Sequence, residues 1–198
     1  MAKNRPVGNL LALAVLAYLT REPMHPYELS RTLRTNGDAR SIKFTHGSLY
    51  MVMQQLAKAG FIAAQETRRE GLRPERTTYA LTPEGRDELR AWLRELVEEP
   101  KHEYPHFVAA LSLIGALPPD DVVALLHNRK LRLGEQRAEI TELLASATAD
   151  GVHPLFLVEE DYRLAVLDAE IGFVDRFLER IGDWRDMWAK FHEERKNL

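Results

Sequence analysis

Residues 45–58 read THGSLYMVMQQLAK and are followed at once by Gly60-Phe61-Ile62. Apolar residues recur here with the spacing of one helical face, which predicts a short helix. The stripe consists of Leu49, Val52, Met53 and Leu56. Thr45 stands before the first turn, where a threonine oxygen can accept a free backbone N–H as an N-cap. Gly60 follows the last periodic residue, as is typical where a helix ends.

The opposite face of this helix carries hydrogen-bonding groups and a cation but no carboxylate. Its members are His46, Ser48, Tyr50, Gln54, Gln55 and Lys58. Residues 39–65 contain no Asp or Glu, whereas Arg40, Lys43 and Lys58 are basic. Such a face suits a polyanion better than plain solvent. We therefore expect this helix to lie against DNA.

Composition describes a globular protein of one large domain, or of a small domain with an appendage. The chain has 198 residues, of which 45% are hydrophobic and 29% are charged. No run of about 18 apolar residues occurs, so no transmembrane span and no membrane partner are expected. The apolar residues 10–19 precede Arg21-Glu22-Pro23 and not a small-residue cleavage site, which favours a buried helix over a signal peptide. The absence of cysteine excludes disulfides and fits a cytoplasmic protein.

The net charge of −3 conceals an asymmetry between the two halves of the chain. Residues 1–86 contain 13 Lys/Arg and 7 Asp/Glu, whereas residues 87–198 contain 14 and 23. A basic half joined to an acidic half indicates a polyanion-binding module carried by a different kind of domain. Chance segregation of solvated charge is the alternative.

Two more helices are expected before the helix at residues 45–58. Residues 9–20 are nearly all apolar, which predicts a helix buried on most sides. A second helix is expected to begin near Pro26, with Tyr27, Leu29 and Leu33 facing inward. The turn residues 35–38 follow. Three helices in this order predict a helix-turn-helix arrangement.

A basic hairpin is expected after the third helix. Residues 61–67 and 76–81 predict its strands and residues 68–75 its tip, where Arg73 and Arg76 belong to a cluster of arginines. Such a hairpin is the wing of a winged helix-turn-helix. Thr82 and Pro83 then predict the start of another helix. We expect its apolar residues Leu89, Leu93 and Leu96 to carry the chain away from the DNA-binding unit.

These elements together resemble the PadR family of bacterial transcriptional regulators over residues 8–95. The matching positions are Tyr27-Glu28-Leu29, Gly47-Ser48-Leu49-Tyr50, Leu56, Gly60, Ile62, Tyr79, Leu81, Thr82 and Gly85. The sequence departs from the family at Pro26, where glycine is usual, and this affects only the local turn. The resemblance implies a DNA-binding winged helix and, in longer members, a C-terminal helical dimerisation domain.

The DNA contacts that the resemblance implies agree with the chemistry of the residues. Thr45, Ser48 and Tyr50 are expected to donate hydrogen bonds to phosphates near the helix N-terminus. His46 and Gln54 are expected at base edges, and the wing cations at the backbone or the minor groove. The full predicted set is Arg40, Lys43, Thr45, His46, Ser48, Tyr50, Gln54, Lys58, Arg73 and Arg76. The alternative for Tyr50 is a half-buried aromatic that covers the helix; for His46 and Gln54 it is a solvated residue.

Pro100 and Pro105 place a domain boundary near residues 98–104, which gives domains at residues 1–98 and 99–198. His102-Glu103-Tyr104-Pro105-His106 formally matches the H-E-x-x-H zinc motif. That motif needs both histidines on one continuous helix, and Pro105 would interrupt it. We therefore expect a linker here, no metal, no cofactor and no catalysis.

The second half predicts three helices, at residues 107–117, 118–146 and 154–191. The first is expected to be mostly buried through Phe107, Leu111, Leu113, Ile114 and Leu117. The last carries two apolar stripes, one of which has no partner left in this chain. The residues of the stripe without a partner are Tyr162, Val166, Ala169, Phe173, Phe177, Trp184 and Trp188. An exposed apolar face of this length predicts a homodimer.

The sequence thus predicts a mainly α protein with a small β-hairpin: a winged helix-turn-helix domain followed by an α-helical dimerisation domain. The expected function is sequence-specific transcriptional regulation by a homodimeric repressor on a palindromic operator. Trp184 and Trp188 are candidates to line a pocket for a small aromatic effector, although packing in the dimer core is favoured for both. The alternative function is a winged-helix protein-interaction module that does not bind DNA.

Overall fold

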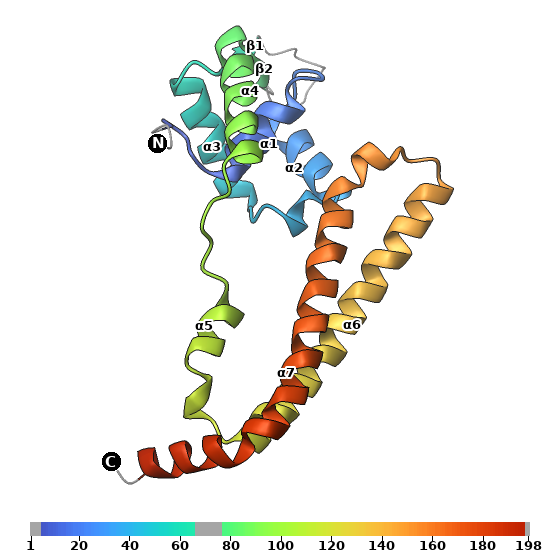
Figure 1. Cartoon of the computed structure of the whole chain (residues 1–198). Coiled ribbons are helices and arrows are strands. Elements are labelled where there is room, and N and C mark those ends of the chain that lie inside the picture. The colour runs from blue at the N-terminus through green and yellow to red at the C-terminus, as the bar shows by residue number, and fades with distance from the viewer. Residues whose placement is uncertain (1–4, 66–76, 197–198) are drawn as a thin grey trace. The chain divides into compact units, whose positions relative to one another are not determined.

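The computed structural model describes residues 5–65 and 77–196 and divides into two compact units, residues 1–102 and 103–198 (Figure 1). The first unit contains three helices, a hairpin and a fourth helix, which confirms the predicted winged helix-turn-helix. Its elements are α1 (Leu10–Tyr18), α2 (Pro26–Thr35), the 3₁₀ turn η1 (Asp38–Arg40), α3 (His46–Lys58), β1 (Ile62–Gln65), β2 (Thr78–Leu81) and α4 (Pro83–Glu98).

The core of the first unit is built on α1, which is apolar on nearly every side. Leu16 in α1, Leu29 in α2 and Leu49 in α3 are each fully buried. The stripe of α3 expected from its spacing is buried throughout, from Leu49 to Leu56. Tyr27 departs from the expected inward face of α2, because its side chain is 59% exposed. Of the predicted inward face, Leu29 and Leu33 are buried. Pro26 and Ser30 are buried as well.

The hairpin begins directly at the end of α3. Strands β1 and β2 are antiparallel, with Ile62 opposite Leu81 and Gln65 opposite Thr78. Met24 exchanges both backbone hydrogen bonds with Tyr79, at 3.1 and 3.0 Å, and so adds a short bridge to the second strand. Strand β2 is therefore held on both of its edges by backbone bonds.

The start of α4 is pressed against the end of α3. Thr82 caps α4 by accepting the N–H of Gly85 at 3.0 Å, and its hydroxyl donates to the Gly60 carbonyl at 2.7 Å. The Thr82 N–H donates to the Phe61 carbonyl at 3.1 Å. A Cβ atom at Gly85 would lie 2.0 Å from that carbonyl oxygen. Only glycine allows this approach.

Helix α4 packs against α1 within the first unit, so it does not carry the chain away from that unit as expected. The buried residues of its inner face include Leu89 and Trp92, whereas Leu93 is 44% exposed. The Arg5 guanidinium stacks over the Trp92 ring and lies 2.8 Å from a Glu88 oxygen. Arg5 also donates to Glu95 at 2.6 Å, and this bond, followed by that of Lys101, holds the pKa of Glu95 below its ordinary value.

The second unit is an antiparallel pair of long helices joined to a short one (Figure 1). Its elements are α5 (His106–Ser112), η2 (Ile114–Ala116), α6 (Pro119–Ala149), η3 (Pro154–Phe156) and α7 (Val158–Lys196). Gly151, at a φ of +79°, ends α6 as its sequence predicts. The mostly buried helix expected at residues 107–117 is wrong: α5 stops at Ser112 and has no buried residue, and Leu113 is 73% exposed.

A small core and a row of ion pairs hold α6 to α7. The core consists of Val122, Leu126, Val174, Ile181 and Trp188. Arg129 donates to Glu170 at 2.6 Å, and Arg137 donates to Asp168 at 2.5 Å, which raises the pKa of Arg137. Lys130 pairs with Asp175 in the same way. In the described ranges no helix is both long and apolar enough to cross a membrane.

Gly85→Ala should lower the free energy of unfolding by about 2–3 kcal/mol, because the added methyl overlaps the Phe61 carbonyl and one of the two segments must move. Gly134→Ala on α6 is the matched control, since its Cβ meets nothing within 4 Å. That control should be neutral or stabilise by up to about 1 kcal/mol. Urea denaturation followed by circular dichroism measures both. Equal stability of the Gly85 variant and the wild type would contradict the close approach.

Candidate nucleic-acid interface

A reciprocal cap fixes the start of α3. The Thr45 hydroxyl accepts the N–H of Ser48 at 3.1 Å, and the Ser48 hydroxyl accepts the N–H of Thr45 at 2.8 Å. The Ser48 hydroxyl also donates to the Thr45 carbonyl at 3.0 Å. Both hydroxyls therefore take part in the cap, which confirms Thr45 as the predicted N-cap, and their bonds to phosphates stay a prediction. The N–H groups at the first two positions, His46 and Gly47, have no acceptor within the helix and point along the positive end of its dipole.

The outer face of α3 is continuous, polar and free of acidic groups. His46, Gln54 and Lys58 are exposed and Tyr50 is half-buried, on the side opposite the buried stripe. At Gly47 a Cβ would meet nothing within 4 Å, so the backbone there is open to a large ligand. Met51 is 60% exposed in the middle of this face. Met51 was not predicted on this face, although it lies four residues after Gly47 and three before Gln54, the spacing of one helical face.

An aromatic cluster joins the N-terminus of α2 to this face. The His46 ring packs edge-on against Tyr50, with centroids 4.8 Å apart, and against Tyr27 at 6.3 Å. Tyr27 was also missed, because its spacing was assigned to the core of α2. The signal was present: Tyr27 lies two residues from Leu29, and residues two apart do not share a helix face.

Hydrogen bonds between α1 and the segment before α3 set the position of this face. The Tyr18 hydroxyl donates to Asp38 at 2.6 Å and accepts from Asn36 at 2.8 Å. Burial, followed by the bond to Asp38, raises the pKa of Tyr18 above its ordinary value. The Arg34 guanidinium stacks over the Phe44 ring at 5.3 Å. These contacts hold residues 36–44, which lead into the Thr45 cap.

The predicted cations divide into two groups. Arg40, Lys43 and Lys58 are exposed, the first two in the segment that leads into α3 and the third in its last turn. Arg73 and Arg76, predicted on the wing, lie outside the described residues.

An exposed apolar surface lies on α7 of the second unit. Tyr162 is 71% exposed, Val166 46%, and Phe173 and Trp184 38% each. Trp188, predicted on this stripe, instead belongs to the core of its own unit, where its indole N–H donates to the Leu117 carbonyl at 3.1 Å. Phe177 is half-buried and stacks on Trp188, with ring centroids 6.5 Å apart. Trp184 and Trp188 line the same cavity of about 460 Å³, together with Phe173, Phe177 and Met187.

The H-E-x-x-H match does not form a zinc site. Pro105 is the N-cap residue of α5, so His102 and Glu103 lie before the helix, as expected. Among the side chains that the structure describes, in residues 5–65 and 77–190, no three His, Asp or Glu are placed to hold a metal ion.

Comparison with known proteins identifies the same family as the sequence motifs. Residues 15–91 match the model of the transcriptional regulator PadR-like family. The negative transcriptional regulator PadR of Bacillus subtilis (strain 168) is 26% identical over 143 residues, which cover 70% of this chain and 77% of that protein.

Solved structures share the fold over nearly the whole chain. Bacillus subtilis PadR in complex with operator DNA matches with a TM-score of 0.70 and 20% identity, over 87% of this chain and 99% of that one. The same regulator in complex with p-coumaric acid matches with a TM-score of 0.69 and 19% identity, over 88% and 99%. At these identities the likeness establishes the fold.

Proposed function

Because this chain is a transcriptional regulator of the PadR family, with its PadR-like domain at residues 15–91, we propose that it is a cytoplasmic repressor that binds a palindromic operator as a homodimer. The observation that carries the proposal is the outer face of α3, which is exposed, hydrogen-bonding and free of carboxylates. The relative PadR of Bacillus subtilis is a negative transcriptional regulator, and one of its solved structures contains operator DNA.

The geometry supports distinct contacts along α3. The uncapped N–H groups of His46 and Gly47 suit a phosphate oxygen at the helix N-terminus. Tyr50 and Tyr27 flank His46, and a phenolic hydroxyl can donate to a backbone phosphate. Met51 and Gln54 occupy the middle of the face, where an apolar group suits a thymine methyl and an amide suits adenine. Lys58, Arg40 and Lys43 supply the sequence-independent charge.

The apolar face of α7 supports the homodimer. Exposed aromatic and branched side chains run along it from Tyr162 to Trp184. The cavity beside Trp184 is lined almost wholly by apolar groups, from Leu111, Ile114 and the α7 aromatics. A second copy covers such a surface better than a polar ligand does. Two copies also supply the two recognition helices that a palindromic operator requires.

The competing functions have less support. Members of this family are transcriptional regulators and not enzymes, which removes the zinc hydrolase. A winged-helix module that binds an acidic protein would share the basic face, and binding to an operator duplex distinguishes the two functions. Release of the operator by a small molecule is part of the proposal, since the relative has been solved with p-coumaric acid as well as with DNA.

Binding to a duplex that carries the promoter of the protein's own gene tests the DNA role. The logarithm of the association constant should fall linearly with the logarithm of salt concentration, because phosphate contacts release counterions. A scrambled duplex of equal length is the control and should bind more weakly at every salt concentration. Absence of binding at low salt, with the protein folded, would contradict the proposal.

Tyr50→Ala should weaken operator binding by about tenfold, which corresponds to one hydrogen bond to a charged phosphate. Fluorescence anisotropy with a labelled operator measures the affinity, and light scattering checks that the dimer persists. Tyr104→Ala is the matched control, since Tyr104 is 86% exposed in the segment before α5. An unchanged affinity for the Tyr50 variant would remove the residue from the interface.

Phe173→Glu should convert the dimer to monomers, because a buried unpaired carboxylate opposes association across an apolar interface. Val97→Glu, at a position 86% exposed near the end of α4, is the control and should leave the dimer intact. Size-exclusion chromatography with light scattering reports both masses. A dimeric Phe173 variant would place the interface elsewhere.

A further inference from the structure

Asp38 is the one carboxylate in the sequence between Glu28 and Glu66. It is the first residue of η1, and Arg40, a predicted DNA contact, is the last. The Cα atoms of residues two positions apart lie within about 7 Å of one another, which is less than the Debye length of about 8 Å at physiological salt. The Asp38 carboxylate is therefore near enough to weaken the attraction of Arg40 for a phosphate.

The Tyr18 hydroxyl determines the direction in which this carboxylate points. It donates to Asp38 Oδ2 at 2.6 Å and accepts from the Asn36 amide at 2.8 Å. The first distance is typical of charge-assisted O–H···O⁻ bonds, about 2.5–2.7 Å, which are stronger than bonds between neutral groups. Tyr18 is the last residue of α1, so the carboxylate faces the end of that helix. Asp38 is half-buried in this position, whereas Arg40 and Lys43 are exposed.

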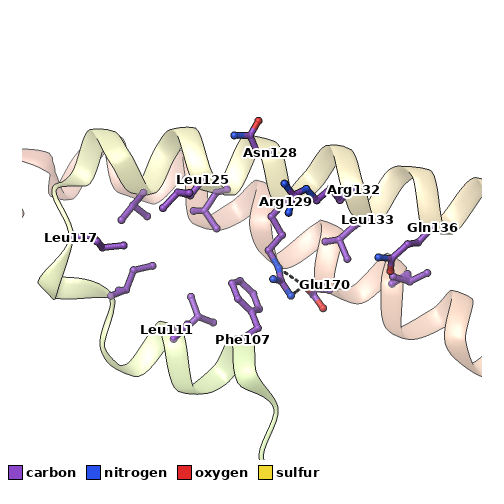
Figure 2. A pocket seen from close by; sticks show the side chains of 15 residues that line it. Phe107, Leu111, Leu117, Leu125, Asn128, Arg129, Arg132, Leu133, Gln136 and Glu170 are labelled. Carbon is purple, nitrogen blue, oxygen red and sulfur yellow. Dashed lines mark hydrogen bonds and ion pairs between the residues drawn. The ribbon is translucent and has the colours of Figure 1, made fainter. Parts of the chain in front are cut away.

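The bond to Tyr18 holds the carboxylate without neutralising it. Arg129 and Glu170 of the second unit, in contrast, form a pair whose charges cancel (Figure 2). The Tyr18 phenol is neutral, and burial, followed by the bond to Asp38, raises its pKa above the ordinary value. The phenol thus remains a donor at physiological pH, and the pair keeps one negative charge. The effect of this charge on a bound polyanion therefore depends on where the carboxylate points.

The main chain of Asp38 fixes the residues that follow it. Its carbonyl accepts the N–H of Ser41 at 3.0 Å and the N–H of Ile42 at 2.8 Å. The Ile42 side chain packs against the core of the first unit. A change in the hydrogen bond of the Asp38 side chain is therefore transmitted along the backbone of residues 38–42.

We propose that Tyr18 is a positioning residue for operator binding, because its hydroxyl directs the Asp38 carboxylate toward α1 and away from the DNA. The cations Arg40 and Lys43 then meet phosphates without an anion between them. A carboxylate released from Tyr18 would turn outward, where it repels phosphates and attracts the same cations. This inference rests on the proposed function, because it concerns the segment that leads into the DNA-binding helix.

Three variants test this role: Tyr18→Phe, Asp38→Asn and the double variant. Tyr18→Phe should lower the affinity for a labelled operator about fivefold, because a carboxylate is released beside the phosphates. Asp38→Asn should bind at least as tightly as the wild type, since an amide oxygen can still accept from Tyr18 and the negative charge is gone. The double variant should match Asp38→Asn to within about twofold. Fluorescence anisotropy measures the four affinities.

Salt concentration gives a second readout. The defect of Tyr18→Phe relative to the wild type should shrink as salt rises, because salt screens repulsion between exposed charges. A defect caused by looser packing would persist at high salt. Tyr104→Phe is the matched control, since it removes the same hydroxyl from a side chain that is 86% exposed in the segment before α5. That control should bind as the wild type does at every salt concentration.

Two results with DNA would overturn the inference. One is equal affinity of the wild type and Tyr18→Phe. The other is a double variant as weak as Tyr18→Phe, because removal of the charge at Asp38 would then restore nothing, and the hydroxyl would have a structural role only.

Hydrogen exchange tests the positioning without DNA. The Ile42 N–H, bonded to the Asp38 carbonyl, should exchange about tenfold faster in Tyr18→Phe than in the wild type. The Leu29 N–H of α2, bonded to the His25 carbonyl at 3.0 Å, is the internal reference and should not change. Equal exchange at Ile42 in both proteins would overturn the inference. A wild type that binds no duplex would contradict the proposed function alone, since exchange at Ile42 still reports whether Tyr18 positions the segment.

Discussion

The contact between Gly85 and the Phe61 carbonyl determines how the first unit is assembled. A Cβ atom at this position would lie 2.0 Å from the oxygen, so the start of α4 can cross the end of α3 only at a glycine. Thr82 locks the crossing with bonds to Gly60 and Gly85. Gly60 itself ends α3 at a φ of +78°. The hairpin thus leaves α3 in a direction fixed by backbone contacts.

Local rules predict much of this unit because the signals are local. The Thr45 cap, the stripe from Leu49 to Leu56 and the Thr82 cap each depend on residues within a few positions of one another. Gly85 was visible in the sequence only as a motif residue. Glycine is required there because the backbone at Gly85 approaches Phe61, 24 positions earlier. A pattern of neighbouring residues cannot predict such a contact. Local chemistry therefore predicts the elements, whereas the close approaches that orient them come from the folded chain.

The wrong assignments share a cause: hydrophobic character was taken for burial. Tyr27 lies about 200° around the helix from Leu29, so its ring emerges beside His46 instead of entering the core. In the middle of α4 the core takes Trp92, whose ring lies under the Arg5 guanidinium, whereas Leu93 is exposed. Leu113 is apolar but 73% exposed. The Arg129–Glu170 pair could not be anticipated either, since it joins two helices across 41 positions.

Ion pairs between α6 and α7 determine where charge remains exposed on the second unit. Cations of α6, namely Arg129, Lys130 and Arg137, are bound to carboxylates of α7. These pairs fix the register of the two helices and neutralise cations that could otherwise attract DNA. The second unit, residues 103–198, contains 18 Asp/Glu and 11 Lys/Arg, so its remaining carboxylates repel a polyanion. The acid-free face of α3 is therefore the surface on which we propose that DNA binds.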